Sequence, residues 1–160
     1  SSDLAGSPVS STRIREALSD GQIPLVNRLL GHAYTLEGEV VHGQGIGRTL
    51  GFATANIRVS ADKALPRFGA YVALLEWKER AYPAMLNIGE HPTLPGDGLK
   101  IEAHVVDEHM DLYGEPVRVS LMDALRPEKR FESADALTVQ LREDAEMVRA
   151  WFQSRMGGAQ

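Results

Sequence analysis

The sequence predicts a mainly β domain, a small barrel or sandwich, with one long helix at its C-terminal end. Short segments in which apolar and polar residues alternate recur between residues 34 and 123, and turn residues separate them, as in all-β domains. After Pro127 the apolar residues recur instead at three- and four-residue steps, which is the period of an amphipathic helix. A strand-rich body therefore precedes a helical end.

The composition indicates one compact domain without disulfides. The chain has 160 residues and no cysteine, which is long enough to bury a sizeable core. Hydrophobic residues make up 43%, yet no apolar run approaches the roughly 18 residues that a membrane helix needs. The first residues, SSDLAGSPVSS, lack the basic region and the apolar core of a signal peptide. We therefore expect a soluble, cytoplasmic protein with no membrane partner.

The charge of the chain argues against nucleic acid as a partner. The formal net charge is -5, and no stripe of basic residues is visible. Binding to nucleic acid depends mainly on neutralising phosphates with Lys and Arg, and this chain is poorly equipped to do so.

The N-terminal part predicts a tail and two short helices. Residues 1–9 are small and polar, which is typical of a flexible tail. Ser11 or Thr12 is placed to cap a helix that runs to residue 18, and Asp20-Gly21 would end it. Residues 25–30 predict a second helix, closed by Gly31.

The strands follow from a period of two. Leu36, Gly38 and Val40 alternate with Glu37, Glu39 and Val41, as expected of a half-buried strand that begins at Tyr34. Further strands are predicted over residues 70–77, 81–86, 99–107 and 116–123. Turn residues lie between them at positions 78–79, 95–98 and 113–115.

The C-terminal helix is predicted to begin at Ser133, a good N-cap residue. Its apolar face comprises Leu137, Leu141, Ala145, Val148 and Phe152. We expect this face to cover the β domain and residues 157–160 to fray.

Residues 42–56, HGQGIGRTLGFATAN, form the most unusual stretch of the chain. Gly43, Gly45 and Gly47 alternate and precede Arg48, and such glycines let backbone N–H groups approach and cradle a phosphate. The stretch is not a Walker A loop, because no Gly-Lys-Ser or Gly-Lys-Thr follows. On spacing alone, a glycine-rich hairpin corner explains it equally well.

Five ordered motifs favour a phosphate cradle over a hairpin corner for residues 42–56, because together they resemble the riboflavin kinase family. They are Gly51-Phe52-Ala53-Thr54-Ala55-Asn56, Asn87-Ile88-Gly89, Glu102-Ala103-His104, Asp111-Leu112-Tyr113-Gly114 and Leu125-Arg126-Pro127-Glu128-Lys129-Arg130-Phe131. The resemblance runs from about Gly31 to Arg149 and has one departure, since the family has proline where this chain has Ala53. It implies a small closed antiparallel, Greek-key-like barrel over residues 32–160 that converts riboflavin and MgATP to FMN and ADP.

Residues 1–31 suggest a preceding domain. Residues 10–16, SSTRIRE, resemble the segment that closes the nucleotidyltransferase domain of bifunctional FAD synthetases. We expect residues 1–31 to be the end of such a domain. No His-x-x-His pair of the kind that this domain uses occurs in the chain, so adenylyl transfer is not assigned to it.

Thr54 and Asn56 are the predicted Mg²⁺ ligands. They are two residues apart, so on an extended segment a hydroxyl and a carboxamide oxygen point to the same face. The alternative is that both make local turn hydrogen bonds.

Glu102 is the predicted catalytic base. Glu102 and His104 share one face of a strand, and Ile101, Ala103 and Val105 share the other. In the family, the glutamate of this motif accepts the proton of the ribityl hydroxyl, a task that suits a carboxylate. The alternative is an ordinary exposed glutamate. We interpret His104 as structural, and the alternative for it is to support a neighbouring site residue.

The resemblance also assigns substrate contacts. ATP contacts would come from Gly43, Gly45, Gly47, Arg48, Asn87 and Thr93, and flavin contacts from Asp111, Tyr113, Arg126 and Phe131. Three alternatives stay open from the residues alone: a plain turn at residues 87–93, a surface ion pair for Arg126, and packing rather than flavin stacking for Trp77 and Trp151.

Two other functions compete with kinase activity. One is a flavin- or nucleotide-binding module without turnover, which the departure at Ala53 supports. The other is an oligonucleotide-binding barrel, which the acidity of the chain and its few aromatic residues disfavour.

Overall fold

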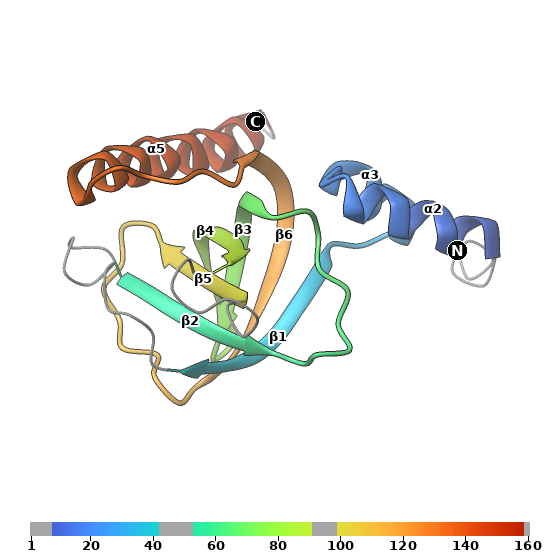
Figure 1. Ribbon diagram of the computed structural model, residues 1–160, viewed down its shortest axis with the longest axis horizontal. Coiled ribbons are helices and arrows are strands. Elements are labelled where there is room, and N and C mark those ends of the chain that lie inside the picture. Colours follow the sequence, from blue (N-terminus) through green and yellow to red (C-terminus); the bar gives the residue numbers. More distant parts are fainter. Residues whose placement is uncertain (1–7, 42–52, 91–98, 159–160) are drawn as a thin grey trace.

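The computed structural model describes residues 8–41, 53–90 and 99–158, and it shows a β-barrel with three helices in that part of the chain (Figure 1). In chain order the elements are α2 (Pro8–Ser19), α3 (Ile23–Leu30), β1 (Tyr34–Val41), β2 (Ala53–Val59), β3 (Gly69–Trp77), β4 (Arg80–Glu90), β5 (Leu99–Val105), β6 (Pro116–Pro127) and α5 (Ala134–Gly158). None of the described helices is both long enough and apolar enough to cross a membrane.

The barrel is closed and antiparallel, as predicted. Its strands follow one another in the order β1-β2-β5-β4-β3-β6, and β6 returns to pair with β1. Two pairs of consecutive strands, β1 with β2 and β3 with β4, are joined by β5 on one side and by β6 on the other. Strand β5 therefore lies between β2 and β4, although it follows both in the sequence.

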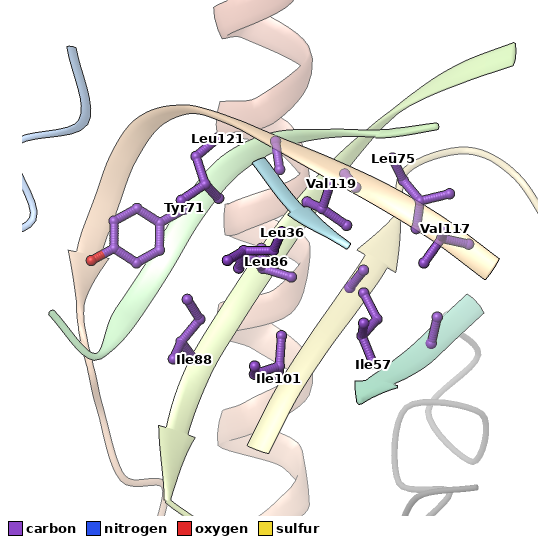
Figure 2. Packing of buried hydrophobic residues seen from close by; sticks show 14 of the residues in the cluster. Leu36, Ile57, Tyr71, Leu75, Leu86, Ile88, Ile101, Val117, Val119 and Leu121 are labelled. Carbon is purple, nitrogen blue, oxygen red and sulfur yellow. The ribbon is translucent and has the colours of Figure 1, made fainter. Parts of the chain in front are cut away.

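The inside of the barrel is filled by apolar side chains from every strand (Figure 2). On β1, Leu36 and Val40 are buried while Glu37 and Glu39 are exposed, which confirms the predicted alternation. The residues labelled in Figure 2 come from all six strands: Leu36, Ile57, Tyr71, Leu75, Leu86, Ile88, Ile101, Val117, Val119 and Leu121. Because these positions point inward, the side chains between them point outward.

A second apolar cluster lies outside the barrel, beneath α5. Ala70 and Val72 of β3 and Met85 of β4 pack against Leu141 and Val148 of the helix. Figure 1 shows α5 lying along this side of the barrel. The Oγ atom of Ser133 accepts a hydrogen bond from the N–H of Ala136 at 3.1 Å, which confirms Ser133 as the N-cap. The helix thus covers the outer face of β3 and β4, as predicted.

The N-terminal helices pack on the barrel near the start of β1. The side chain of Asn27 on α3 donates to the backbone oxygen of Leu121 at 2.9 Å and accepts from the N–H of Tyr34 at 2.8 Å. Gly31 ends α3 with φ 83°, as predicted. The predicted start of the first helix is wrong, because α2 already begins at Pro8, a residue that suits the first turn of a helix.

Several strand ends differ from the prediction. Strand β6 continues to Pro127 rather than residue 123, and register shifts in its pairing with β3 interrupt the period of two. Strand β4 runs to Glu90 rather than residue 86. Strand β5 ends at Val105, because Asp107 has φ 62° and turns the chain. The turn at Lys78 and Glu79 is confirmed by φ values of 50° and 63°, and the predicted turn at 95–98 lies outside the described residues.

Candidate active site

Three predicted site residues lie in one row across the outer face of the barrel. Glu102 on β5 lies directly opposite Asn56 on β2 and, on its other side, directly opposite Asn87 on β4. Paired residues of neighbouring antiparallel strands have Cβ atoms about 4.5–5.5 Å apart. The strand order thus places the carboxylate between the carboxamide of Asn87, on the preceding strand, and that of Asn56, which is far from it in the sequence.

Thr54 and His104 form the neighbouring row. They are paired across β2 and β5, and Thr54 Oγ1 lies 3.2 Å from His104 Nδ1. Thr54 and Asn56 share one face of β2, as predicted, and it is the outer face, because Ala55 and Ile57 point into the barrel core. The predicted metal ligands therefore lie beside the predicted base.

Glu102 is buried, with 6% of its surface exposed, so the alternative of an ordinary exposed glutamate is wrong. Its Oε1 atom lies 3.1 Å from Lys100 Nζ. Lys100 stands two residues earlier on the same face of β5, and its stem reaches the carboxylate along the strand. The ammonium group compensates the buried carboxylate and fixes one of its two oxygens.

His104 is also buried, with 7% exposed. Burial lowers the pKa of His104 below its ordinary value of 6.5, and the nearby carboxylate of Glu102 opposes this in part. The imidazole is therefore neutral at pH 7 and carries one ring proton. Its Nε2 atom lies 4.0 Å from Glu102 Oε1, and an ionised carboxylate can only accept, so Nε2 is the nitrogen better placed to carry that proton.

The carboxamides of Asn56 and Asn87 are half-buried. In the part of the chain that the structure describes, neither side chain hydrogen-bonds to another residue, and both stand beside Glu102. Polar groups of this kind at the edge of a buried carboxylate are suited to contact a ligand.

The oxygen atoms of Thr54 and Asn56 fit Mg²⁺. A hydroxyl and a carboxamide oxygen are hard, neutral donors, and Mg²⁺ in phosphoryl-transfer sites takes only a few protein ligands besides water and phosphate. Among the described residues, no group of three or more His, Cys, Asp or Glu side chains is arranged to hold a metal ion. The chemistry of this pair therefore suits a metal that arrives with a nucleotide.

Arg126 continues the row of Asn87, because Ala70 on β3 pairs with Asn87 on one side and with Arg126 on the other. The guanidinium group binds Asp144 of α5, with Nη2 2.8 Å from Oδ2 and Nε 3.1 Å from Oδ1. Asp144 is 1% exposed, so this pair is not the surface ion pair that the sequence left open.

The sequence analysis did not identify Asp144 as the partner of Arg126, although the sequence contains a feature that indicates it. It falls on the buried stripe of α5 that includes Leu141, Ala145 and Val148, where a charged residue is out of place. Gln140 also donates to Asp144, from Nε2 to Oδ1 at 3.0 Å. A carboxylate on an apolar helix face thus indicated a buried cationic partner.

Phe131 lies close to two cations. The guanidinium carbon of Arg126 is 5.8 Å from the centre of its ring, and Lys129 Nζ is 5.6 Å away. Arg126 and Phe131 therefore lie together at the end of β6, as two residues of one predicted flavin contact would.

The other two predicted flavin residues lie before the start of β6. The N–H of Tyr113 donates to Asp111 Oδ1 at 3.1 Å, and the side chain of Tyr113 is 56% exposed. Leu112 between them is buried, and Gly114 turns the chain with φ 81°. The four predicted flavin residues thus form two pairs at opposite ends of β6, and their assignment stays a prediction.

The remaining predicted site residues lie outside the described part of the chain. They are Gly43, Gly45, Gly47, Arg48 and Thr93. The two tryptophans serve packing, because Trp77 packs against the barrel core and Trp151 against the cluster beneath α5. Each also donates from Nε1 at 2.9 Å, Trp77 to Glu115 Oε1 and Trp151 to Asp123 Oδ2.

Comparison with known proteins gives one consistent family. The sequence pattern of the family described as Riboflavin kinase matches residues 30–152. A bifunctional riboflavin kinase/FMN adenylyltransferase from Listeria monocytogenes is 38% identical over 149 residues, and the match covers 92% of this chain and 48% of the relative. A protein of the same description from Escherichia coli strain K12 is 40% identical over 148 residues, covering 92% and 47%. The chain thus spans about half the length of the curated relatives it matches.

Solved structures share the fold. A crystal structure described as a macrolide-efflux protein from Streptococcus pneumoniae superposes with a TM-score of 0.81 and 38% identity, covering 88% of this chain and 46% of the other. Riboflavin kinase from Trypanosoma brucei superposes with a TM-score of 0.52 and 24% identity, covering 74% and 79%, which speaks for the fold alone. The family pattern matches residues 30–152, and the barrel carries the row centred on Glu102. The chain therefore belongs to the riboflavin kinase family.

Proposed function

We propose that this chain transfers the γ-phosphoryl group of ATP to the ribityl hydroxyl of riboflavin on the outer face of β2, β5 and β4. The observation that carries the proposal is the row Asn56, Glu102, Asn87, in which one buried carboxylate stands between two carboxamides. Phosphoryl transfer needs positioning, charge neutralisation and an acceptor for the hydroxyl proton, and this row supplies the acceptor.

Glu102 acts as the general base. Its Oε1 atom is engaged by Lys100, so we assign the incoming proton to Oε2. As the proton leaves, the ribityl oxygen forms a bond to the γ-phosphorus, the bond from that phosphorus to the bridging oxygen breaks, and ADP departs. The products are FMN, ADP and a proton that Glu102 later returns to water.

The flanking side chains orient the reactants. Thr54 and Asn56 would hold Mg²⁺, which would neutralise phosphate charge; their position beside Glu102 supports this role. Asn87, on the other side of Glu102, would donate to a substrate oxygen from its amide group. Gly43, Gly45, Gly47, Arg48 and Thr93 are proposed to contact ATP, and Asp111, Tyr113, Arg126 and Phe131 the flavin, on the resemblance alone.

The replacement Glu102→Gln tests the base. Glutamine keeps the shape of the side chain but cannot take the proton, so FMN formation should fall by roughly 10²- to 10⁴-fold, whereas riboflavin binding, followed by quenching of flavin fluorescence, should change little. Glu39→Gln, which alters an exposed carboxylate on β1, is the matched control and should behave as the parent. Parent-like turnover of Glu102→Gln would remove this residue from the mechanism.

The metal ligands are tested by Thr54→Ala and Asn56→Ala. Each change removes one oxygen donor, so each variant should need more Mg²⁺ for half-maximal turnover and for ADP binding. Titration curves that coincide with that of the parent protein, for both variants, would show that the metal is held elsewhere.

A flavin- or nucleotide-binding module without turnover is the competing function. The departure at Ala53 is the feature that favours it. A parent protein that binds riboflavin and ADP but makes no FMN from riboflavin and ATP would establish this alternative and reject the kinase proposal.

We also propose that residues 1–31 adjoin a nucleotidyltransferase domain in a longer cytoplasmic protein. The relatives that match 92% of this chain are bifunctional and about twice as long. The mass of the native protein in cell extract, measured with an antibody against the barrel, tests this: a native mass near 17.5 kDa would contradict it.

A further inference from the structure

We propose that His104 is a positioning residue that orients the hydroxyl of Thr54 toward the metal of the bound nucleotide. This inference rests on the proposed function, because only a metal–nucleotide complex gives the hydroxyl of Thr54 that task. The sequence favoured a structural role for His104 and left a supporting role in the site open, and the contacts of the ring favour the supporting role.

The ring of His104 contacts both partners from one buried position. It is 7% exposed, its Nδ1 atom lies 3.2 Å from Thr54 Oγ1, and its Nε2 atom lies 4.0 Å from Glu102 Oε1. The pairing of Thr54 with His104 and of Asn56 with Glu102 places the four side chains in two adjacent rows of the same face. One imidazole thus links the predicted metal ligand to the predicted base.

The two ring nitrogens have different tasks. Nε2 lies 4.0 Å from the Glu102 carboxylate, which is too far for a hydrogen bond, but the negative charge on that side favours the tautomer with its proton on Nε2. Nδ1 is then an acceptor, and the hydroxyl of Thr54 is its donor. Glu102 therefore selects the tautomer that receives the proton of Thr54.

The direction of that proton decides what Thr54 can bind. A hydroxyl has one proton and two lone pairs, and a cation is bound only through a lone pair. When the proton is donated to Nδ1, it is turned away from any cation at the site. If His104 did not accept this proton, the hydroxyl could turn it toward the cation, which would weaken binding.

A pair of variants separates this role from simple packing. In His104→Asn the side-chain oxygen can occupy the place of Nδ1 and accept from Thr54, whereas in His104→Gln a methylene group occupies that place and the polar end reaches toward Glu102. Both residues are polar and smaller than histidine, so loss of packing affects them alike. A packing role predicts equal effects, and a positioning role predicts that asparagine rescues and glutamine does not.

The measurement is the affinity for ADP by isothermal titration calorimetry, with Mg²⁺ and with a chelator, on this 160-residue chain. In the parent, Mg²⁺ should strengthen ADP binding. In His104→Gln, Mg²⁺ should strengthen ADP binding roughly 3- to 10-fold less than in the parent, which is the effect of one hydrogen bond. The affinity for ADP measured with the chelator should stay the same. His104→Asn should retain it.

The double variant of Thr54→Val with His104→Gln provides a second test, because valine keeps the shape of threonine and removes the hydroxyl. If His104 acts through Thr54, His104→Gln should cause no further loss of the Mg²⁺ effect in a Thr54→Val background. Equal losses in His104→Gln and His104→Asn, additive losses in the double variant, or a parent protein whose ADP binding ignores Mg²⁺ would each overturn the proposal. Failure of the kinase proposal is seen separately, as absence of FMN from the parent, and leaves this comparison readable.

Discussion

Arg126 and Asp144 form a two-point ion pair that fixes α5 to the end of β6. Two guanidinium nitrogens face the two carboxylate oxygens, at 3.1 Å and 2.8 Å, and 2% of the side-chain surface of Asp144 is exposed. Lys129 and Gln140 extend the contact, because Lys129 Nζ donates to Gln140 Oε1 at 3.2 Å and Gln140 donates to Asp144. The helix is thus held by a polar cluster as well as by its apolar face.

Removal of one member of this pair should destabilise the protein strongly. Asp144→Ala leaves the largely buried guanidinium of Arg126 without its partner, so the free energy of unfolding should fall by about 3–5 kcal/mol. Denaturation by urea measures this change. Glu37→Ala, which breaks the exposed pair with Arg118, is the control and should cost about 1 kcal/mol or less. Similar decreases in the free energy of unfolding for both variants would contradict the explanation that burial makes the Arg126–Asp144 pair more important.

Two glycines should resist replacement for different reasons. A Cβ atom on Gly38 would overlap the backbone oxygen of Arg58, so β1 and β2 would have to separate. We expect Gly38→Ala to cost roughly 1–3 kcal/mol or more. Gly31 has open space but φ 83°, so Gly31→Ala should cost about 1–2 kcal/mol.

Asparagine separates the two causes, because it tolerates the left-handed conformation but is larger than alanine. Gly31→Asn should be more stable than Gly31→Ala, whereas Gly38→Asn should be no better than Gly38→Ala. Thermal melts of the four variants provide the comparison, and rescue of position 38 by asparagine would rule out the steric explanation.

Ala53 is the first residue of β2, a place in a strand that proline tolerates. Ala53→Pro should stabilise the protein by roughly 0.4–1 kcal/mol, because proline restricts the unfolded chain. It should also strengthen MgATP binding by fixing the approach to Thr54 and Asn56. Melts with and without MgATP decide this. A lower melting temperature in both conditions would show that the N–H of Ala53 is needed for pairing with Val105.

The buried histidine should make stability depend on pH. Burial lowers the pKa of His104 from 6.5, so as pH falls the unfolded chain takes up the proton before the folded one does. In metal-free buffer the contribution of His104 to the free energy of unfolding is fully present above pH 6.5 and is lost progressively below that value. Urea denaturation between pH 8 and pH 5 should show this fall. His104→Gln should remove this part of the dependence, and His32→Gln, at an exposed site, should leave it intact.

The sequence predicts those parts of the structure in which one face of a strand is buried and the other is not. Leu36 and Val40 on β1, and Ala103 between Glu102 and His104 on β5, show the required alternation. The outer position of Thr54 and Asn56 follows from the same rule. What no local pattern contains is that β5 lies between β2 and β4, and hence that Asn56, Glu102 and Asn87 meet.

Prediction fails where the chain departs from a regular period. The register shifts between β3 and β6 interrupt the period of two, so the sequence did not predict residues 124–127 as part of β6. The positive φ of Asp107 ends β5 earlier than predicted. Local pattern also gave no partner for Arg126, because Asp144 lies 18 residues away on a different element. The family motifs supplied residue identities at the site, whereas distances and burial came only with the fold.

The position of β5 between β2 and β4 also determines when the site can exist. Strands β3, β4 and β5 are neighbours in the chain, so Glu102 meets Asn87 within a hairpin, but Glu102 meets Asn56 only after β5 has paired with β2. Pairing of β5 with β2 closes a long loop, which is slow compared with hairpin formation. A refolding chain should therefore recover hairpin structure first and catalytic turnover last, so turnover reports completed barrel closure.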